Sequence, residues 1–228
     1  MRKWIVALVM IAGCGTDTPV CPVRTDRSVC ATPLRIVVAG DSVAHGEGDE
    51  SRLGFARHLD RELASLGIAH EATIDLAISG SRTWQLARVL AQTRSRELIA
   101  KADAVVLSIG GNDLYGDSRA RLLSLIAPRL MMDLAVERIA SIVRTVERES
   151  QARIVLLGVY DPYRNPRLDE YVNVWSAKLF DRFADDRRVS VITIADLFVA
   201  RRRISPIDGF HPNADAYQRI ARRVAEAM

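Results

Sequence analysis

Short apolar runs that end in glycine and polar residues recur along this chain, and their alternation with helical segments constrains the fold more than any other feature. Runs of this length indicate strands that are buried on both faces. Strands that alternate with helices indicate a parallel sheet covered by helices on both sides. The expected strands are Leu34–Ala39, Ala72–Ile78, Ala104–Ile109, Arg153–Val159 and Val189–Ile194.

The segments that separate and follow these runs carry apolar residues at helical spacing. Gly67 is expected to end the first helix, and Pro128 to break or kink the longest one. A length of 228 residues allows one domain with a sizeable core. We therefore expect one α/β domain over residues 34–228, with a five-stranded parallel sheet in a three-layer α/β/α sandwich. The expected helices are Leu53–Leu66, Arg82–Ala100, Ser118–Glu149, Leu168–Phe183 and Asn213–Ala227.

Polar, glycine-rich stretches lie where the expected strands end. In parallel sheets, ligands bind at the carboxyl ends of the strands. Side chains from these stretches are therefore expected to meet at one edge of the sheet. The stretches are Gly40-Asp41-Ser42, Ser79-Gly80-Ser81, Gly110-Gly111-Asn112-Asp113 and, before the last helix, Asp208-Gly209-Phe210-His211-Pro212-Asn213.

Ser42 is a candidate nucleophile, because it follows a buried strand at the turn into a helix. A serine at such a turn is exposed at the top of the sheet, where a substrate can reach it. A serine that merely caps the helix is the alternative. Serine is a poor nucleophile by itself and needs an adjacent base that accepts its proton.

Four histidines are candidates for that base. His45 follows the serine in the same turn, and His58 falls inside the first helix. His70 precedes the second strand, at the opposite end of the sheet. His211 is in a loop on the correct side, and Asp208 is near enough in that loop to hold the imidazole in one tautomer. A simple loop salt bridge between the two is the alternative.

Acyl transfer also requires donors for the negative charge that develops on the carbonyl oxygen. The candidates are the backbone N–H groups of Ser42 and Gly80 and the side-chain amide of Asn112. Glycine at position 80 permits a close approach of backbone to substrate. For Asn112, a purely structural role as a cap of its own loop is the alternative.

The four stretches, in this order, resemble those of the SGNH hydrolases, the GDSL-type esterases and lipases, over residues 34–228. The run from Leu107 to Leu114 looks like the bacterial lysophospholipase and acylhydrolase branch, which includes lipoproteins. The second stretch departs from the pattern, because many relatives have an asparagine shortly before its glycine and this chain has Asp75-Leu76-Ala77-Ile78. The resemblance implies a flavodoxin-like fold. It also implies a triad of Ser42, His211 and Asp208 with oxyanion donors at Ser42, Gly80 and Asn112.

The function that follows is hydrolysis of a lipid, lysophospholipid or small acyl ester through an acyl-enzyme. A carbohydrate or cell-wall O-acetylesterase would use the same machinery. A surface-binding lipoprotein without activity is the alternative of another class. Apolar residues near the expected strand ends are candidates for an acyl pocket, with core packing as the alternative: Trp84, Leu114, Tyr115, Tyr160, Tyr163 and Phe210.

Composition argues against several other functions. The chain is 49% hydrophobic and 26% charged, with a net charge of +4. Its basic residues are scattered apart from Arg187-Arg188 and Arg201-Arg202-Arg203, so no nucleic-acid partner is expected. The histidines are not at metal-ligand spacing and there is no phosphate-binding loop, so neither a metal nor another cofactor is expected. The oligomeric state stays open.

The first residues resemble a lipoprotein leader. Arg2 and Lys3 give a positive start, and Trp4–Ala12 is an apolar run too short to span a bilayer. The sequence Ile11-Ala12-Gly13-Cys14 resembles a bacterial lipobox, where a diacylglycerol is attached to the cysteine. An ordinary secretory signal with a cysteine nearby is the alternative.

The expected arrangement is thus a signal peptide over 1–13 and a tether over 14–33. If Cys14 carries lipid, Cys21 and Cys30 remain, and outside the cytoplasm such a pair is expected to form a disulfide. The protein would be held at a membrane of the bacterial cell envelope, outside the cytoplasm, by its N-terminal lipid.

Overall fold

A five-stranded, all-parallel sheet forms the centre of the computed structural model, which describes residues 32–199 and 201–228. Its strand order is β2-β1-β3-β4-β5, the order of flavodoxin-like folds. The predicted three-layer α/β/α sandwich is therefore confirmed. The strands are β1 Ile36–Gly40, β2 Ile74–Asp75, β3 Ala104–Ser108, β4 Arg153–Leu157 and β5 Val189–Ile192.

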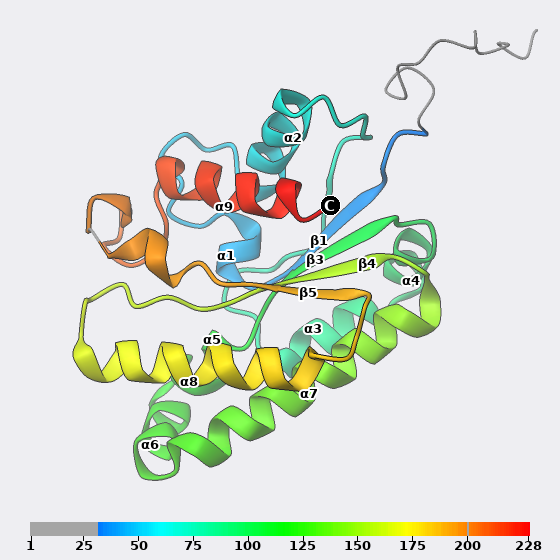
Figure 1. The fold of residues 1–228 in the computed structure, drawn as a ribbon. Coiled ribbons are helices and arrows are strands. Elements are labelled where there is room, and N and C mark those ends of the chain that lie inside the picture. Colours follow the sequence, from blue (N-terminus) through cyan, green and yellow to red (C-terminus); the bar gives the residue numbers. More distant parts are fainter. Residues whose placement is uncertain (1–31, 200) are drawn as a thin grey trace, which may run out of the picture. The chain divides into compact units, whose positions relative to one another are not determined.

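Helices cover both faces of the sheet (Figure 1). Helices α1, α2 and α9 lie on one face, and α3, α4, α7 and α8 on the other. No helix in the described part of the chain is both long and apolar enough to cross a membrane. The helices are α1 Ser42–His45, α2 Phe55–Ser65, α3 Thr83–Leu90, α4 Thr93–Ala100, α5 Gly111–Tyr115, α6 Ser118–Ile126, α7 Pro128–Glu149, α8 Pro166–Phe183 and α9 Ala214–Glu226, with 3₁₀ turns η1 Ala195–Phe198 and η2 Arg201–Arg203.

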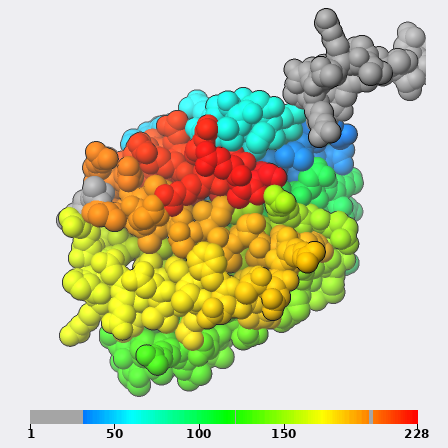
Figure 2. Space-filling view, viewed as in Figure 1, coloured from blue at the N-terminus to red at the C-terminus, as the bar shows by residue number. Residues whose placement is uncertain are grey.

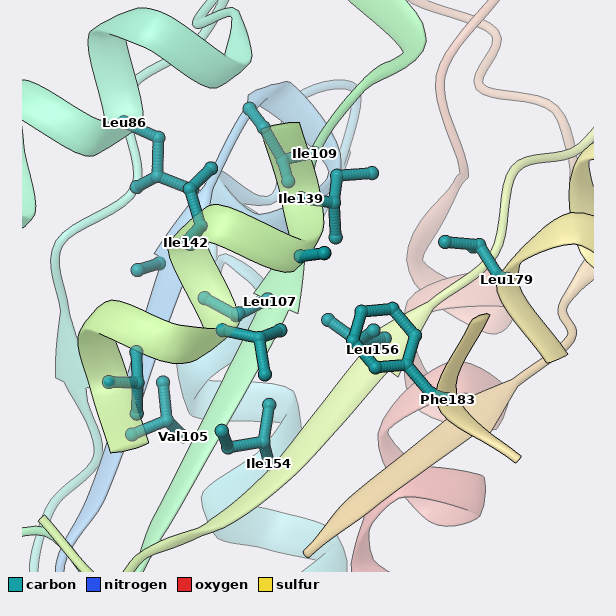
Figure 3. Packing of buried hydrophobic residues seen from close by; sticks show 14 of the residues in the cluster. Leu86, Val105, Leu107, Ile109, Ile139, Ile142, Ile154, Leu156, Leu179 and Phe183 are labelled. Carbon is teal, nitrogen blue, oxygen red and sulfur yellow. The ribbon is translucent and has the colours of Figure 1, made fainter. Parts of the chain in front are cut away.

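Two hydrophobic cores hold the layers together, because successive strand residues point to opposite faces of the sheet. Val105 and Leu107 of β3 join the core under α7 and α8, with Leu179 and Phe183 of α8 (Figure 3). Val106, which lies between Val105 and Leu107 in β3, joins the core under α2 and α9. Residues 32–228 thus bury both faces of their own sheet and form a compact unit, which we expect to fold by itself.

Two of the predicted helices are each two helices in the structure. The segment 118–149 breaks at Ala127, because the following Pro128 disfavours helical backbone in the residue before it. The segment 82–100 breaks at Gln92, whose extended backbone begins α4. Neither glycine nor proline lies at that second break, so the sequence pattern did not predict it.

Strand β2 is shorter than predicted, with Ile74 and Asp75 in place of 72–78. It lies at the edge of the sheet, and among the described strands it pairs with β1 alone. Beyond it, the N–H groups of Leu76 and Ile78 still donate to the β1 carbonyls of Val38 and Gly40 at 2.8 and 3.1 Å. The segment therefore follows β1 to its end without regular strand geometry.

Several predictions fall outside the described residues. These are the signal peptide over 1–13, nearly all of the tether over 14–33, the lipid on Cys14 and the disulfide between Cys21 and Cys30. They stay predictions.

Gly40 can be tested as a position that only glycine tolerates. Its φ of +145° disfavours other residues, and a Cβ there would lie 1.9 Å from the carbonyl oxygen of Ser108. Gly40→Ala should therefore lower the free energy of unfolding by about 3 kcal/mol or more, measured by urea denaturation. Gly111→Ala is the matched control, because nothing lies within 4 Å of its added Cβ. Equal midpoints for both variants would contradict this account of the β1–β3 contact.

Candidate active site

Ser42 lies at the carboxyl end of β1, as the first residue of α1. Asp41 caps this short helix, because its Oδ1 accepts a hydrogen bond from the Val43 N–H at 3.1 Å. Gly46, with a φ of +93°, ends the helix after one turn. Ser42 is thus held by a cap before it and a glycine turn after it, with 9% of its surface exposed.

A hydrogen bond from Asn112 reaches the turn after β2. The Nδ2 of Asn112 donates to the carbonyl oxygen of Ser81 at 3.0 Å, and Ser81 follows Gly80 directly. Gly80 has a φ of +79°, so its conformation rather than lack of space favours glycine. A primary amide has two N–H donors, and the bond to Ser81 uses one of them. The second remains for another acceptor.

His211 and Asp208 are paired in the loop before α9. The Nδ1 of His211 is 2.7 Å from the Oδ2 of Asp208, and Oδ1 accepts from the backbone N–H groups of Phe210 and His211 at 2.8 and 3.0 Å. Partial burial acts to raise the pKa of Asp208, but these hydrogen bonds outweigh it and hold that pKa below its usual value. Asp208 is therefore a carboxylate that orients the imidazole.

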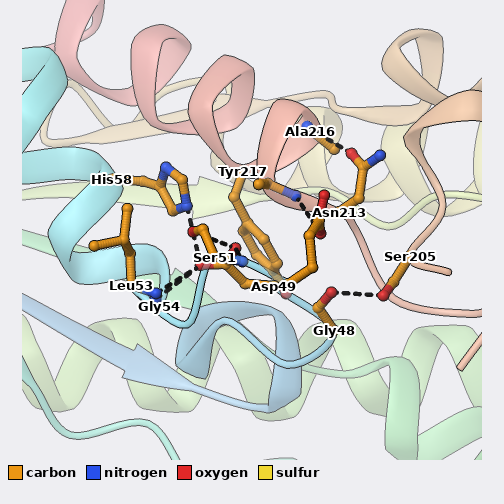
Figure 4. A network of polar contacts seen from close by, with 12 residues as sticks. Gly48, Asp49, Ser51, Leu53, Gly54, His58, Ser205, Asn213, Ala216 and Tyr217 are labelled. Atoms are coloured by element: carbon orange, nitrogen blue, oxygen red, sulfur yellow. Dashed lines mark hydrogen bonds and ion pairs between the residues drawn. The ribbon is translucent and has the colours of Figure 1, made fainter. Parts of the chain in front are cut away.

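The loop after α1 packs directly against the loop that carries His211. A Cβ on Gly48 would lie 2.6 Å from the Cβ of His211, and the Ser205 hydroxyl donates to the Gly48 carbonyl at 2.6 Å (Figure 4). The hydroxyl of Tyr217, on α9, donates to the Glu47 carbonyl at 2.7 Å. Sequence reasoning missed these contacts, since residues about 160 positions apart carry no local signal of their pairing.

Asp49 holds the same loop from within. Its carboxylate accepts hydrogen bonds from the backbone N–H groups of Ser51, Leu53 and Gly54, from the Ser51 hydroxyl and from the His58 ring (Figure 4). Burial acts to raise the pKa of Asp49, but these donors lower it below its usual value. The loop after α1 is thus built around one saturated carboxylate.

A cavity of about 310 Å³ opens beside Ser42 and Asn112. The surface is hollowed between the yellow region of α8 and the orange segment before α9 (Figure 2). Residues of α8, such as Tyr171 and Trp175, line the cavity, and so does Phe210 of the segment before α9. Five predicted pocket residues line the cavity, but Trp84 does not; its half-exposed ring lies under the Arg88 guanidinium. The five are Leu114, Tyr115, Tyr160, Tyr163 and Phe210.

His211 and Gly80 are not among the residues that line this cavity. The ring of His211 packs edge-on against Phe210, which does line it, with ring centroids 4.8 Å apart. The carbonyl of Phe210 accepts from the hydroxyl of Tyr160, another lining residue, at 3.0 Å. The structure therefore brings the His211–Asp208 pair to the wall of the cavity that contains Ser42.

The other three histidines also face carboxylates. The Nδ1 of His45 is 3.4 Å from Asp75, and the Nε2 of His58 is 3.0 Å from the buried Asp49. The Nε2 of His70 is 3.7 Å from Asp60. None of these three histidines lines the cavity beside Ser42.

Residues 32–199 and 201–228 contain no cluster of three or more histidine, cysteine or acidic side chains able to hold a metal ion. Asp113, next to Asn112, has a structural role. Its buried carboxylate accepts from the backbone N–H and the hydroxyl of Thr83, at 2.9 and 2.6 Å, and so ties α5 to the start of α3.

Comparison with known proteins agrees with the geometry. The model of the GDSL-like Lipase/Acylhydrolase family matches residues 38–219. An uncharacterized protein, YpmR of Bacillus subtilis (strain 168), is 28% identical over 215 residues, which cover 86% of this chain and 83% of that protein.

Solved structures share the fold. The lipase Lip_vut3 from a goat rumen metagenome superposes with a TM-score of 0.71 at 21% identity, over 85% of this chain and 97% of that one. A family 3 carbohydrate esterase from Clostridium thermocellum superposes with a TM-score of 0.61 at 19% identity, over 86% and 98%. At these sequence identities, the superpositions establish that the fold is shared and nothing more.

The buried carboxyl of Asp41 makes the stability of the domain depend on pH. Burial raises its pKa to about 7, and hydrogen bonds from the Val43 N–H and the Ser108 hydroxyl offset this only in part. In the unfolded chain the pKa is about 3.9. Between these two pH values the folded state binds more protons than the unfolded chain does. The contribution of Asp41 to the free energy of unfolding therefore falls as pH rises from about 4 to about 7.

Asp41→Asn keeps an acceptor for Val43 and Ser108 but cannot ionise. The free energy of unfolding of this variant, relative to that of the parent, should therefore rise by about 3 kcal/mol between pH 4.5 and pH 8. This figure follows from the difference between the two pKa values of Asp41. Urea denaturation of both proteins at the two pH values measures this, and other titrating groups cancel in the comparison. A difference that does not change with pH would contradict it.

Proposed function

The chain belongs to the GDSL-like lipase/acylhydrolase family, a family of carboxylic ester hydrolases, and we propose that it cleaves its esters through an acyl-enzyme on Ser42. The observation that carries this proposal is the 2.7 Å contact between His211 and Asp208 beside the cavity that Ser42 and Asn112 line. An intact set of these residues, together with family membership, disfavours the non-catalytic alternative.

The triad would act in two half-reactions. The Ser42 Oγ attacks the ester carbonyl carbon while its proton passes to the Nε2 of His211, since Nδ1 faces Asp208. The tetrahedral intermediate then expels the alcohol, which takes the proton from Nε2. Water then attacks the acyl carbon while the Nε2 of His211 takes one of its protons. The second tetrahedral intermediate breaks its bond to Ser42, whose Oγ takes that proton back as the free acid leaves. Asp208 stays ionised and stabilises the imidazolium throughout.

Three donors would stabilise the oxyanion: the backbone N–H groups of Ser42 and Gly80 and the second N–H of Asn112. The bond from Asn112 to Ser81 supports this assignment, because it holds the amide beside the turn that contains Gly80. Such donors need no reorganisation when charge develops, since hydrogen bonds within the protein already fix their positions.

The acyl chain of the substrate would lie in the cavity beside Ser42. Aliphatic and aromatic side chains such as Leu114, Met132 and Trp175 line it, and its volume of about 310 Å³ exceeds what an acetyl group requires. We therefore favour a lipid, lysophospholipid or other acyl ester with an extended chain. Hydrolysis rates for a series of esters from acetyl to long chain should peak above acetyl.

A carbohydrate or cell-wall O-acetylesterase is the second candidate. Four tyrosines line the cavity, and aromatic rings suit sugar rings as well as acyl chains. The similarity to the Clostridium thermocellum carbohydrate esterase also favours it. Turnover of acetylated glycans at rates above those of all longer acyl esters would assign the site to this class.

The triad assignment predicts which variants lose activity. Ser42→Ala and His211→Ala should each remove nearly all ester hydrolysis, because the three residues act as a unit. Asp208→Asn should be milder, since Ser42 and His211 remain. A fluorophosphonate probe should label Ser42 in the parent and fail to label Ser42→Ala.

Asn112→Ala supplies the matched comparison, because it removes one oxyanion donor and leaves the triad intact. Its turnover should fall by about a hundredfold to a thousandfold, with the free energy of unfolding little changed. Probe labelling of Ser79 or Ser81 would contradict the assignment of Ser42. Full activity in His211→Ala would transfer the role of base to His45.

We propose in addition that Cys14 is acylated and becomes the first residue of the mature protein, which would tether the domain to a membrane outside the cytoplasm. The lipobox-like sequence before Cys14 supports this. Mass spectrometry of the membrane-extracted protein should find a diacylglycerol-modified Cys14. An unmodified N-terminus at another residue would contradict it.

A further inference from the structure

Helix α6 and the first turns of α7 expose large apolar side chains to an unusual extent. Leu125 and Ile126 have 73% and 71% of their surface exposed. Soluble domains rarely leave so many neighbouring apolar residues in water without a binding function. We call this surface the apolar cap, and it consists of Leu122, Leu123, Leu125, Ile126, Leu130 and Leu134.

The orientation of α6 is inverted relative to an ordinary surface helix. Its small residues Ala120 and Ser124 are buried, whereas its leucines face outwards. The Ser124 hydroxyl donates to the carbonyl of Leu114 at 2.9 Å, so a polar bond attaches this helix to the domain. Folding of the domain therefore does not account for Leu125 and Ile126, because 73% and 71% of their surface stays exposed.

Basic charge accompanies the apolar cap. Arg119 and Arg129 are exposed, and neither has an ion pair with another residue in the described part of the chain. The acidic residues of the same segment differ, because Asp117 pairs with Arg82, and Asp133 with Lys178 of α8. Exposed leucines beside unpaired arginines form the pattern of helices that lie on anionic lipid surfaces.

The apolar cap also lies next to elements that line the cavity beside Ser42. Leu114 and Tyr115 of α5 and Met132 of α7 line that cavity, and the bond from Ser124 joins α6 to Leu114. Figure 1 shows α6 at the outer side of the helical layer, next to the start of α7. An acyl chain that leaves a lipid surface at the apolar cap would therefore have the apolar wall of the cavity nearby.

We propose that the apolar cap docks the domain on an anionic lipid surface, from which an ester enters the cavity. The choice of lipid over protein rests on Arg119 and Arg129, which have no ion pair among the described residues, and on the position of the apolar cap next to elements that line the cavity. The role in substrate supply rests on the proposed esterase function, whereas docking itself does not depend on catalysis.

Vesicle binding tests the proposal. The protein is residues 14–228 with Cys14→Ser, so that a lipid anchor does not itself bind vesicles. It should sediment with vesicles of phosphatidylglycerol and phosphatidylcholine, and added salt should weaken this binding. Leu125→Gln with Leu130→Gln should weaken it about tenfold or more, because glutamine keeps the helix but removes apolar area.

A second variant tests the role of charge, and a third is a control for the loss of exposed apolar area. Arg119→Gln with Arg129→Gln should weaken binding to the anionic vesicles about tenfold and leave binding to phosphatidylcholine alone unchanged. Phe180→Gln with Val199→Gln is the matched control, since both residues are exposed and apolar but lie outside the apolar cap. This control should bind like the parent.

The variants also distinguish docking from catalysis. Hydrolysis of a soluble short-chain ester should be equal in the parent and the leucine variant, whereas hydrolysis of a vesicle-borne ester should fall in the variant. Vesicle binding without any ester cleavage would refute the proposed function and leave docking standing. Ester cleavage without vesicle binding would refute docking alone.

Three other results would overturn the proposal. One is equal vesicle binding by the leucine variant and the parent. Another is loss of binding in the Phe180 and Val199 control to the same extent. A third is a dimer in sedimentation velocity that dissociates on Leu125→Gln with Leu130→Gln, which would assign the apolar cap to a second copy of the chain.

Discussion

The close contact between β1 and β3 at their carboxyl ends determines where Ser42 can lie. Without a side chain, Gly40 lets the Asp41 N–H donate to the Ser108 carbonyl at 2.8 Å. The Asp41 carboxyl also accepts from the Ser108 hydroxyl and caps α1. Two adjacent residues thus join the helix to the neighbouring strand, so the next residue, Ser42, has little freedom to move.

The other parts of the site are attached to this edge by bonds between distant segments. Asn112 reaches Ser81 in the turn after β2, and Ser205 reaches Gly48 in the loop after α1. Both bonds end on backbone carbonyl oxygens, which a change of side chain does not remove. Loops on a rigid sheet acquire fixed relative positions in this way, as a preorganised site requires.

The sequence was sufficient for the five strands in their order along the chain and for the four polar stretches, because buried strands and glycine turns leave local patterns. It overestimated the length of β2, which is Ile74–Asp75. It could not predict the break at Gln92, where neither proline nor glycine interrupts the helical spacing. Nor could it predict the contact of Gly48 with His211 and Ser205, which depends on how two loops meet in the folded chain. The second of these two missed features depends on a tertiary contact, and the first has no local signal in the sequence.

Helix α6 shows a further limit of apolar periodicity. Leucines at helical spacing ordinarily indicate the face that packs on the core. In α6 the buried face consists of Ala120 and Ser124, and the helix is tied to the domain through the Leu114 carbonyl. Spacing alone identifies an apolar face but not what covers it. The two cores of the domain do not include the leucines of α6, so the proposed partner of these leucines lies outside the fold. Arg119 and Arg129, which have no ion pair within residues 32–199 and 201–228, favour an anionic partner.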